Sequence, residues 1–132
     1  MEKQDVATKK VILIVDDDKT LLELYERMFG AHGVEAVIAK DGQEGIEMVR
    51  SHRPDFVILD IRMPKVDGIR VLEMIRKEEG LKDTPVLILT NYGEEEYREA
   101  TKKLGIVDFV VKTDIDPTAL VRRVVDLISR RQ

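Results

Sequence analysis

Acidic residues gather where apolar segments of this chain end. In "VILIVDDDKT", which starts at Val11, five apolar residues run directly into Asp16, Asp17 and Asp18. A second apolar run, "DFVILD" at 55–60, ends at Asp60. Like charges within a few ångströms repel and raise one another's pKa values. Carboxylates grouped in this way need either a compensating positive charge or free access to water.

Two other apolar runs end in residues that complement these acids. "PVLILT" (85–90) ends at Thr90, and "VDFVVK" (107–112) ends at Lys112. The carboxyl ends of parallel strands lie along one edge of a sheet, where ligands bind. We therefore predict one pocket that holds the carboxylates of Asp16, Asp17 and Asp60 with one hydroxyl and one ammonium group.

Phosphoryl transfer requires such a set. Its transition state spreads charge over three oxygens, so catalysis is mostly positioning and electrostatics. The chain has no cysteine, and neither histidine is suitably placed, so the ligands are all oxygens and favour Mg²⁺, with Mn²⁺ as a substitute, over zinc. Asp16 and Asp17 are adjacent and suit joint metal ligation. Asp60 stands alone on its strand, and we assign it as the nucleophile that forms an acyl phosphate.

The elements that must position these residues alternate along the chain. Apolar, β-branched runs at 11–15, 34–39, 55–60, 85–90 and 107–112 are each followed by a stretch of helical period, the fourth (93–105) being the weakest. Asp41 and Asp116 have the character of N-caps. Alternating strands and helices form right-handed βαβ units, which predicts an α/β fold with a parallel sheet covered on both faces.

Length and composition bound the class of protein. The chain of 132 residues fits one domain, which we place at 10–132 after a polar N-terminal tail at 1–9. The net charge of −4 argues against direct binding of nucleic acid. No apolar run reaches the length of a membrane span, and the N-terminus lacks the apolar stretch of a signal peptide. We expect a cytoplasmic protein with no membrane partner.

Four motifs resemble a known family. They are "VDDD" (15–18), "DIRMPKVDG" (60–68), "LILT" (87–90) and "GIVDFVVK" (105–112), and the second fits D-x-x-M-P-x-x-D-G in full. Together they resemble the response-regulator receiver domain of two-component signalling, from residue 11 to about 130. The resemblance implies a flavodoxin-like (βα)5 domain whose five-stranded parallel sheet has the order 2-1-3-4-5.

The resemblance also implies roles for the acids. Asp60 is expected to be the phosphoacceptor, taking its phosphoryl group from a phosphohistidine on a histidine kinase or a histidine phosphotransfer protein. Asp17, Asp60 and the backbone carbonyl of Arg62 would bind Mg²⁺ directly. Asp16 would act on the metal largely through water.

The same resemblance implies a switch. Lys112 would contact the phosphoryl group, while the Thr90 hydroxyl moves toward it and the Phe109 ring turns inward behind it. The fourth helix, fifth strand and fifth helix would dock a downstream protein target, and a phosphorylation-dependent homodimer through the same helices fits this scheme. Such a domain is a signalling module rather than an enzyme, and catalyses only its own phosphorylation and slow autodephosphorylation.

Some positions depart from the family pattern. Thr113 replaces the usual proline after Lys112, so we expect a trans peptide bond and a rearranged loop. Asn91 replaces a small residue after Thr90. Arg62 and Tyr92 should flank the entry path, and we expect them to tune the lifetime of the phosphorylated state.

Two alternatives stay open at the level of sequence. "DDDKT" (16–20) also fits D-x-D-x-T of haloacid-dehalogenase-type phosphohydrolases, with Asp16 as nucleophile and Asp18 as acid–base group. Against this, no acidic pair follows Lys112 and no cap insertion is present. Asp18 is read instead as an N-cap. The other alternative is a receiver-like binding module that is never phosphorylated.

Overall fold

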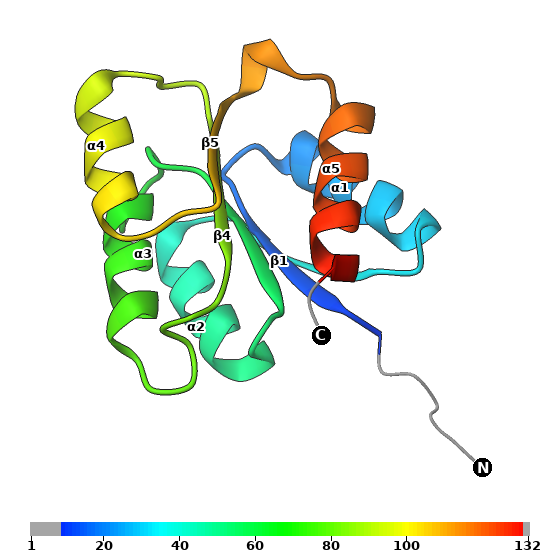
Figure 1. Ribbon diagram of the computed structural model, residues 1–132, viewed down its shortest axis with the longest axis horizontal. Coiled ribbons are helices and arrows are strands. Elements are labelled where there is room, and N and C mark those ends of the chain that lie inside the picture. The colour runs from blue at the N-terminus through cyan, green and yellow to red at the C-terminus, as the bar shows by residue number, and fades with distance from the viewer. Residues whose placement is uncertain (1–8, 131–132) are drawn as a thin grey trace.

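The computed structural model describes residues 9–130 (Figure 1), so the expected tail at 1–9 lies outside the described residues except for Lys9. The strands are β1 (Val11–Val15), β2 (Glu35–Ala39), β3 (Phe56–Leu59), β4 (Val86–Thr90) and β5 (Asp108–Val111). The helices are α1 (Lys19–Ala31), α2 (Gly42–His52), α3 (Gly68–Lys77), α4 (Glu95–Lys103), α5 (Pro117–Arg130) and a short 3-10 helix, η1 (Lys112–Asp114).

The strands form one parallel sheet of order β2-β1-β3-β4-β5, which confirms the expected flavodoxin-like arrangement. The apolar runs of β3 and β4 are buried at every position, because helices cover the sheet on both faces. The expected fifth strand is too long, since Lys112 begins η1. The turn of η1 directs the chain away from the sheet edge toward α5.

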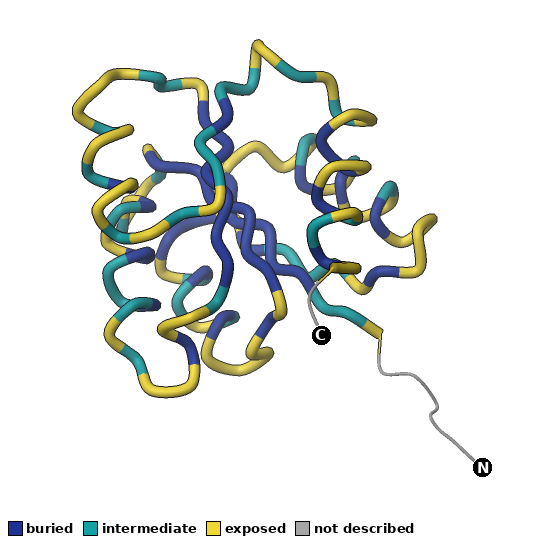
Figure 2. Tube along the Cα trace, in the orientation of Figure 1, coloured by how far each residue is buried: buried dark blue, intermediate teal, exposed yellow. Residues whose placement is uncertain are grey.

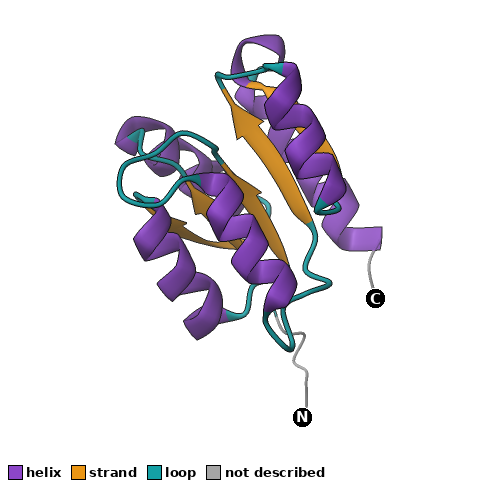
Figure 3. Ribbon diagram, turned by 90° about the vertical axis from the view of Figure 1, so that its left-hand side faces the viewer, coloured by secondary structure: helices purple, strands orange, loops and turns teal. Residues whose placement is uncertain are grey.

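Helices α1 and α5 pack on one face of the sheet, and α2, α3 and α4 pack on the other (Figures 1 and 3). The tube in Figure 2 shows the central strands β1, β3 and β4 as the most deeply buried part of the sheet. Each face has its own apolar cluster: Leu22, Phe29 and Val124 belong to the first, and Val71, Leu72 and Ile75 to the second. The strands that carry the candidate site are therefore fixed by close packing on both faces of the sheet.

Side-chain caps fix where four of the helices begin. The Oδ1 atoms of Asp18, Asp41, Asp67 and Asp116 each accept a hydrogen bond from the backbone N–H three residues on, at 2.8–3.1 Å. This confirms the capping role expected for Asp18, Asp41 and Asp116. By contrast, Glu94 at the start of α4 makes no side-chain cap.

Gly68 allows the start of α3 to approach the end of β3 closely. A Cβ atom at this position would lie 1.9 Å from the Asp60 carbonyl oxygen, a contact that no side chain tolerates. The Gly68 N–H also donates to the Ile61 carbonyl at 2.6 Å. The loop that follows Asp60 is thereby folded back tightly onto the acid itself.

Candidate functional site

Three carboxylates meet at the carboxyl edge of the sheet. One carboxylate oxygen from each of Asp16, Asp17 and Asp60 lies within 4.8 Å of the others. Ladder hydrogen bonds set this spacing, because the Asp60 N–H donates to the Val15 carbonyl (2.9 Å) and the Asp16 N–H donates to the Ala39 carbonyl (3.0 Å). The grouping of these acids predicted from the strand ends is confirmed.

The acids in "DDD" have different surroundings. Asp16 is only 2% exposed, and its Oδ1 accepts the Asp18 N–H at 2.9 Å. Asp17 is exposed at the rim of the site. The Asp18 carboxylate caps α1 through the Leu21 N–H. Of these three acids, only Asp16 and Asp17 therefore belong to the cluster with Asp60.

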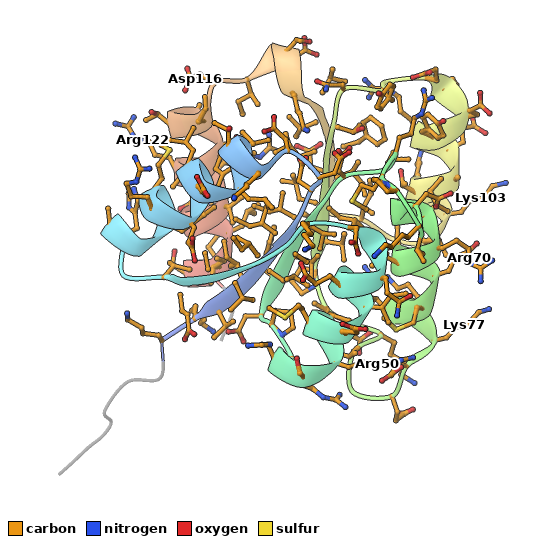
Figure 4. The ribbon with its side chains drawn as sticks, turned by 180° about the vertical axis from the view of Figure 1, so that it is seen from behind. Arg50, Arg70, Lys77, Lys103, Asp116 and Arg122 are labelled. Atoms are coloured by element: carbon orange, nitrogen blue, oxygen red, sulfur yellow. The ribbon has the colours of Figure 1, made fainter. Side chains whose placement is uncertain are left out.

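Lys112 supplies the positive charge that the acids need. Its Nζ lies 2.8 Å from Asp16 Oδ2 and 3.5 Å from Asp60 Oδ2. Burial alone would lower the pKa of Lys112, but the hydrogen bond to Asp16 and the charge of Asp60 raise it above its usual value. The cations labelled in Figure 4 lie instead on the outer surface of the helices: Arg50 on α2, Arg70 and Lys77 on α3, Lys103 on α4 and Arg122 on α5. Within residues 9–130, Lys112 is the cation that forms ion pairs with Asp16 and Asp60.

Burial dominates the electrostatics of the two inner acids. It raises the pKa of Asp16 to about 6, against the lowering effect of Lys112, and the charge of Asp60 adds to the rise. It also raises the pKa of Asp60, which is 4% exposed, although Lys112, the Thr90 hydroxyl and the Ile61 N–H lower it. Both carboxylates are thus short of positive charge even with Lys112 in place.

This deficit provides a test of whether a metal fits. Three carboxylate oxygens converge without sulfur or imidazole, and two of the acids are buried with a single lysine between them. Hard divalent cations prefer such oxygen ligands, and the exposed Asp17 leaves room for retained water. The donor set therefore suits Mg²⁺.

The remaining predicted residues surround this cluster. Thr90 is 0% exposed, and its Oγ1 accepts the Tyr92 N–H at 3.3 Å. The Arg62 guanidinium carbon lies 4.2 Å from the centroid of the Tyr92 ring, so the two residues expected to flank the entry path contact each other. Asn91 is exposed beside them. The described residues contain no cis peptide bond, which confirms the trans bond expected before Thr113.

Phe109 is half-buried on β5. An arginine that the sequence analysis did not single out, Arg98 of α4, places its guanidinium carbon 4.6 Å from the Phe109 ring centroid. No local motif marks Arg98, because the contact joins side chains eleven positions apart on different elements. A surface arginine in a weak helical pattern looks the same whether or not it meets a ring.

Within residues 9–130, no helix combines the length and the apolar character that crossing a membrane requires.

Comparisons with known proteins agree with this geometry. Residues 12–125 match the family described as the response regulator receiver domain. A "probable transcriptional regulator ycf27" of Guillardia theta is 37% identical over 126 residues, covering 96% of this chain and 48% of that protein. The "regulatory protein AtoC" of Escherichia coli K12 is 35% identical over 123 residues, covering 92% of this chain and 26% of that protein.

Solved structures show the same likeness. The receiver domain of Francisella response regulator 1452 superimposes with a TM-score of 0.82 at 29% identity, covering 94% of this chain and 100% of that one. The phosphorylated cyanobacterial phytochrome response regulator RcpA gives a TM-score of 0.78 at 26% identity, with 91% of each chain covered.

The chain spans about half or less of these curated relatives, which are longer regulators. The shared part carries the acidic pair, the D-x-x-M-P-x-x-D-G motif and the strand-end threonine and lysine within the matched range of 12–125. The chain belongs to the response-regulator receiver domains, which are signalling modules of two-component systems.

Proposed function

We propose that this receiver accepts a phosphoryl group on Asp60 from a phosphohistidine donor, with Mg²⁺ bound at the acid cluster. The observation that carries the proposal is the position of the Asp60 carboxylate. It is buried among two further acids, and the Lys112 ammonium bridges it to Asp16. A carboxylate placed in this way is prepared for in-line attack once its charge is balanced.

The acids would hold the ion through Asp17, Asp60 and the Arg62 carbonyl, with Asp16 acting largely through water. When bound, Mg²⁺ neutralises charge on the carboxylates and on the transferring phosphoryl oxygens. Mn²⁺ satisfies the same oxygen ligands. Lys112 already lies against Asp60 and would contact a phosphoryl oxygen on it.

The switch would begin at Thr90, whose buried hydroxyl lies at the end of the neighbouring strand. Its movement toward the phosphoryl group would release the Tyr92 N–H that it now accepts, and so would alter the β4–α4 loop. The Phe109 ring would turn inward, and the face formed by α4, β5 and α5 would engage the downstream partner. The net charge of −4 favours a protein target over direct nucleic-acid binding.

Arg62 and Tyr92 would tune how long the phosphoryl group lasts. Their stacked pair joins the loop after Asp60 to the loop after Thr90, so the pair screens the entry to the acceptor from water. We expect Arg62→Ala and Tyr92→Ala each to change the dephosphorylation rate about threefold to tenfold, and the double variant to add little. Arg70→Ala, an exposed arginine on α3, is the matched control. Unchanged rates in both single variants would contradict this role.

Acetyl phosphate with Mg²⁺, followed by mapping of the modified aspartate by mass spectrometry, tests the proposal. We expect one phosphoryl group on Asp60, none in Asp60→Asn, and normal modification in the cap-preserving control Asp67→Asn. Modification at Asp16 with Asp60 untouched would favour a phosphohydrolase of the haloacid-dehalogenase type. No modification, together with no Mg²⁺ binding at millimolar concentration, would favour an unphosphorylated binding module.

A further inference from the structure

Two guanidinium–aromatic contacts lie on either side of the β4–α4 loop, which connects Thr90 to Glu95. Arg62 stacks on Tyr92 at the acceptor side, and Arg98 stacks on Phe109 at the helix side. Arg98 makes a second contact, because its Nε donates to the Gly93 carbonyl at 3.0 Å. One side chain of α4 therefore binds both the backbone of the loop and the ring on β5.

The sheet register places this ring on the same face as Thr90. Phe109 pairs with Ile88, and Val111 pairs with Thr90, so side chains two residues apart point the same way. Gly93 packs over this face: a Cβ atom there would lie 2.9 Å from Val111 Cγ2 and 3.4 Å from an Arg98 nitrogen. A displacement of the loop after Thr90 would therefore reach Arg98 through Gly93.

Arg98 makes these contacts although acids are close by. Glu95 and Glu99 line the same surface hollow on α4. Even so, within the described part of the chain no carboxylate forms an ion pair with Arg98. A planar guanidinium can stack on a ring while its N–H groups bind a carbonyl, which an ammonium group cannot do. Arg98 therefore contacts the Phe109 ring and the Gly93 carbonyl rather than the carboxylates of Glu95 and Glu99.

We propose that Arg98 is a positioning residue that holds the Phe109 ring in its half-buried place and ties it to the β4–α4 loop. The inference rests on the proposed function, in which this ring turns inward after phosphorylation. Inward rotation requires the stack with Arg98 to break, so Arg98 favours the unphosphorylated arrangement. Its removal should raise the population of the other arrangement and thereby the apparent affinity for a phosphoryl mimic.

Fluorine NMR of protein labelled with 4-fluorophenylalanine observes this ring directly. The chain has three phenylalanines, and Phe29 and Phe56 are 0% and 1% exposed, so the half-buried Phe109 has a distinct environment. Phe109→Leu assigns its line. The spectra compare wild type with Arg98→Ala, Arg98→Lys and the control Lys102→Ala, which removes another cation of the same hollow.

Without Mg²⁺ or beryllofluoride, we expect Arg98→Ala to shift or broaden the Phe109 line, with a change of about fivefold in the ratio of ring positions, the size of one exposed cation–π contact. Arg98→Lys should fall between wild type and Arg98→Ala, and Lys102→Ala should match wild type. A Phe109 line in Arg98→Ala with the position and width of wild type would overturn the inference. This arm needs no phosphoryl chemistry.

A second arm adds Mg²⁺ and titrates beryllofluoride. We expect half-saturation of Arg98→Ala at a concentration about threefold to fivefold lower than for wild type. Equal half-saturation in the two proteins would overturn the inference even if the ring has moved. If beryllofluoride leaves the wild-type spectrum as unchanged as that of Asp60→Asn, the proposed function itself is wrong. The two failures are therefore distinguishable.

Discussion

Helices α3 and α4 lie side by side on one face of the sheet but are attached to it very differently (Figure 1). Helix α3 begins at the Asp67 cap and buries four residues: Gly68, Val71, Leu72 and Ile75. Helix α4 has no side-chain cap and buries Thr101 alone. The Thr101 hydroxyl donates to the Tyr97 carbonyl within the same helix, so it adds no bond to the sheet.

This difference follows the chemistry at the head of each helix. Helix α3 follows Asp60, the proposed phosphoacceptor, whose geometry would stay constant through phosphorylation. Helix α4 follows Thr90 and the loop that would respond to it. Elements with little buried apolar surface open at a lower free energy than well-packed ones. We infer that α3 anchors the acceptor and that α4 is the element free to move.

The largest expected effect comes from truncating the buried face of α3. Leu72→Ala should lower the free energy of unfolding by about 2–5 kcal/mol, because it opens a cavity in a close-packed core. Leu72 is 0% exposed, whereas Leu104 at the end of α4 is half-buried. Leu104→Ala should cost under about 2 kcal/mol. Urea unfolding measures both, and equal losses would contradict the contrast between the helices.

The second prediction concerns Arg76, a residue of α3 that binds the chain just after α4. Its guanidinium donates to the Leu104 and Gly105 carbonyls (2.6 Å each) after α4 and to the Lys82 and Thr84 carbonyls (3.1 and 2.8 Å) before β4. Arg76→Ala should lower the unfolding free energy by about 2 kcal/mol, since four backbone carbonyls, two of them in part-buried hydrogen bonds, lose a charged donor.

Arg76→Lys is the matched control, because one ammonium group cannot span four carbonyls, so we expect it to recover less than half of the loss. Amide exchange of residues 101–105 should accelerate in Arg76→Ala while α3 keeps its protection. If instead α3 loses protection and residues 101–105 do not, Arg76 does not anchor α4.

The caps give a smaller contrast. Asp67 accepts the Arg70 N–H at 3.1 Å, so Asp67→Ala should lower the unfolding free energy by about 1 kcal/mol. Glu94 at the corresponding position of α4 makes no such bond, and Glu94→Ala should change the unfolding free energy by less than about 0.5 kcal/mol. Thermal unfolding of both variants tests this, and a Glu94→Ala loss as large as that of Asp67→Ala would show that α4 is capped after all.

The smallest expected effect is a pH dependence of the unfolding free energy that arises from Asp41, the N-cap of α2. The Glu44 N–H holds the pKa of Asp41 below its usual value, and the charge of Lys65 adds to this, so the carboxylate stabilises the fold in its ionised form. A lowered pKa gives stability that is present above the unfolded value near 4 and is lost as the pH falls through the folded value.

Asp41→Asn keeps a capping side chain but does not titrate. Wild type should therefore be the more stable protein at neutral pH, and the difference should shrink below about pH 4. A difference that stays constant from neutral to acid pH, in urea unfolding at each pH, would show that the Asp41 charge contributes nothing.

The sequence was sufficient to predict which strand-end residues meet at the site and which residues cap the helices. Strand ends of a parallel sheet meet at one edge, so Asp16, Asp60, Thr90 and Lys112 could be placed together from position alone. The N-caps could be predicted equally well, because a cap depends on a residue and the N–H three positions on. These inferences succeed because each depends on local spacing or on a general rule of topology.

The contacts that arginine side chains make with residues distant in the sequence could not be predicted in this way. Arg98 meets Phe109, and Arg76 meets carbonyls as far as 29 positions away, through rotamers that no sequence period specifies. The stack of Arg62 on Tyr92 joins two loops, and only their folded paths bring it about. The fifth strand was predicted to include Lys112, but it ends at Val111. The apolar run before Lys112 does not show where the strand ends and the 3-10 turn begins.

Amide hydrogen exchange with and without beryllofluoride and Mg²⁺ tests the central claim most directly. We infer that loading Asp60 changes α4, β5 and the loop between β4 and α4, while β1, β3 and α3 keep their structure. We predict changed exchange at 91–111 and unchanged exchange at 11–15, 56–59 and 68–77, with no change anywhere in Asp60→Asn. A change spread equally over both regions, or confined to α3, would contradict the account.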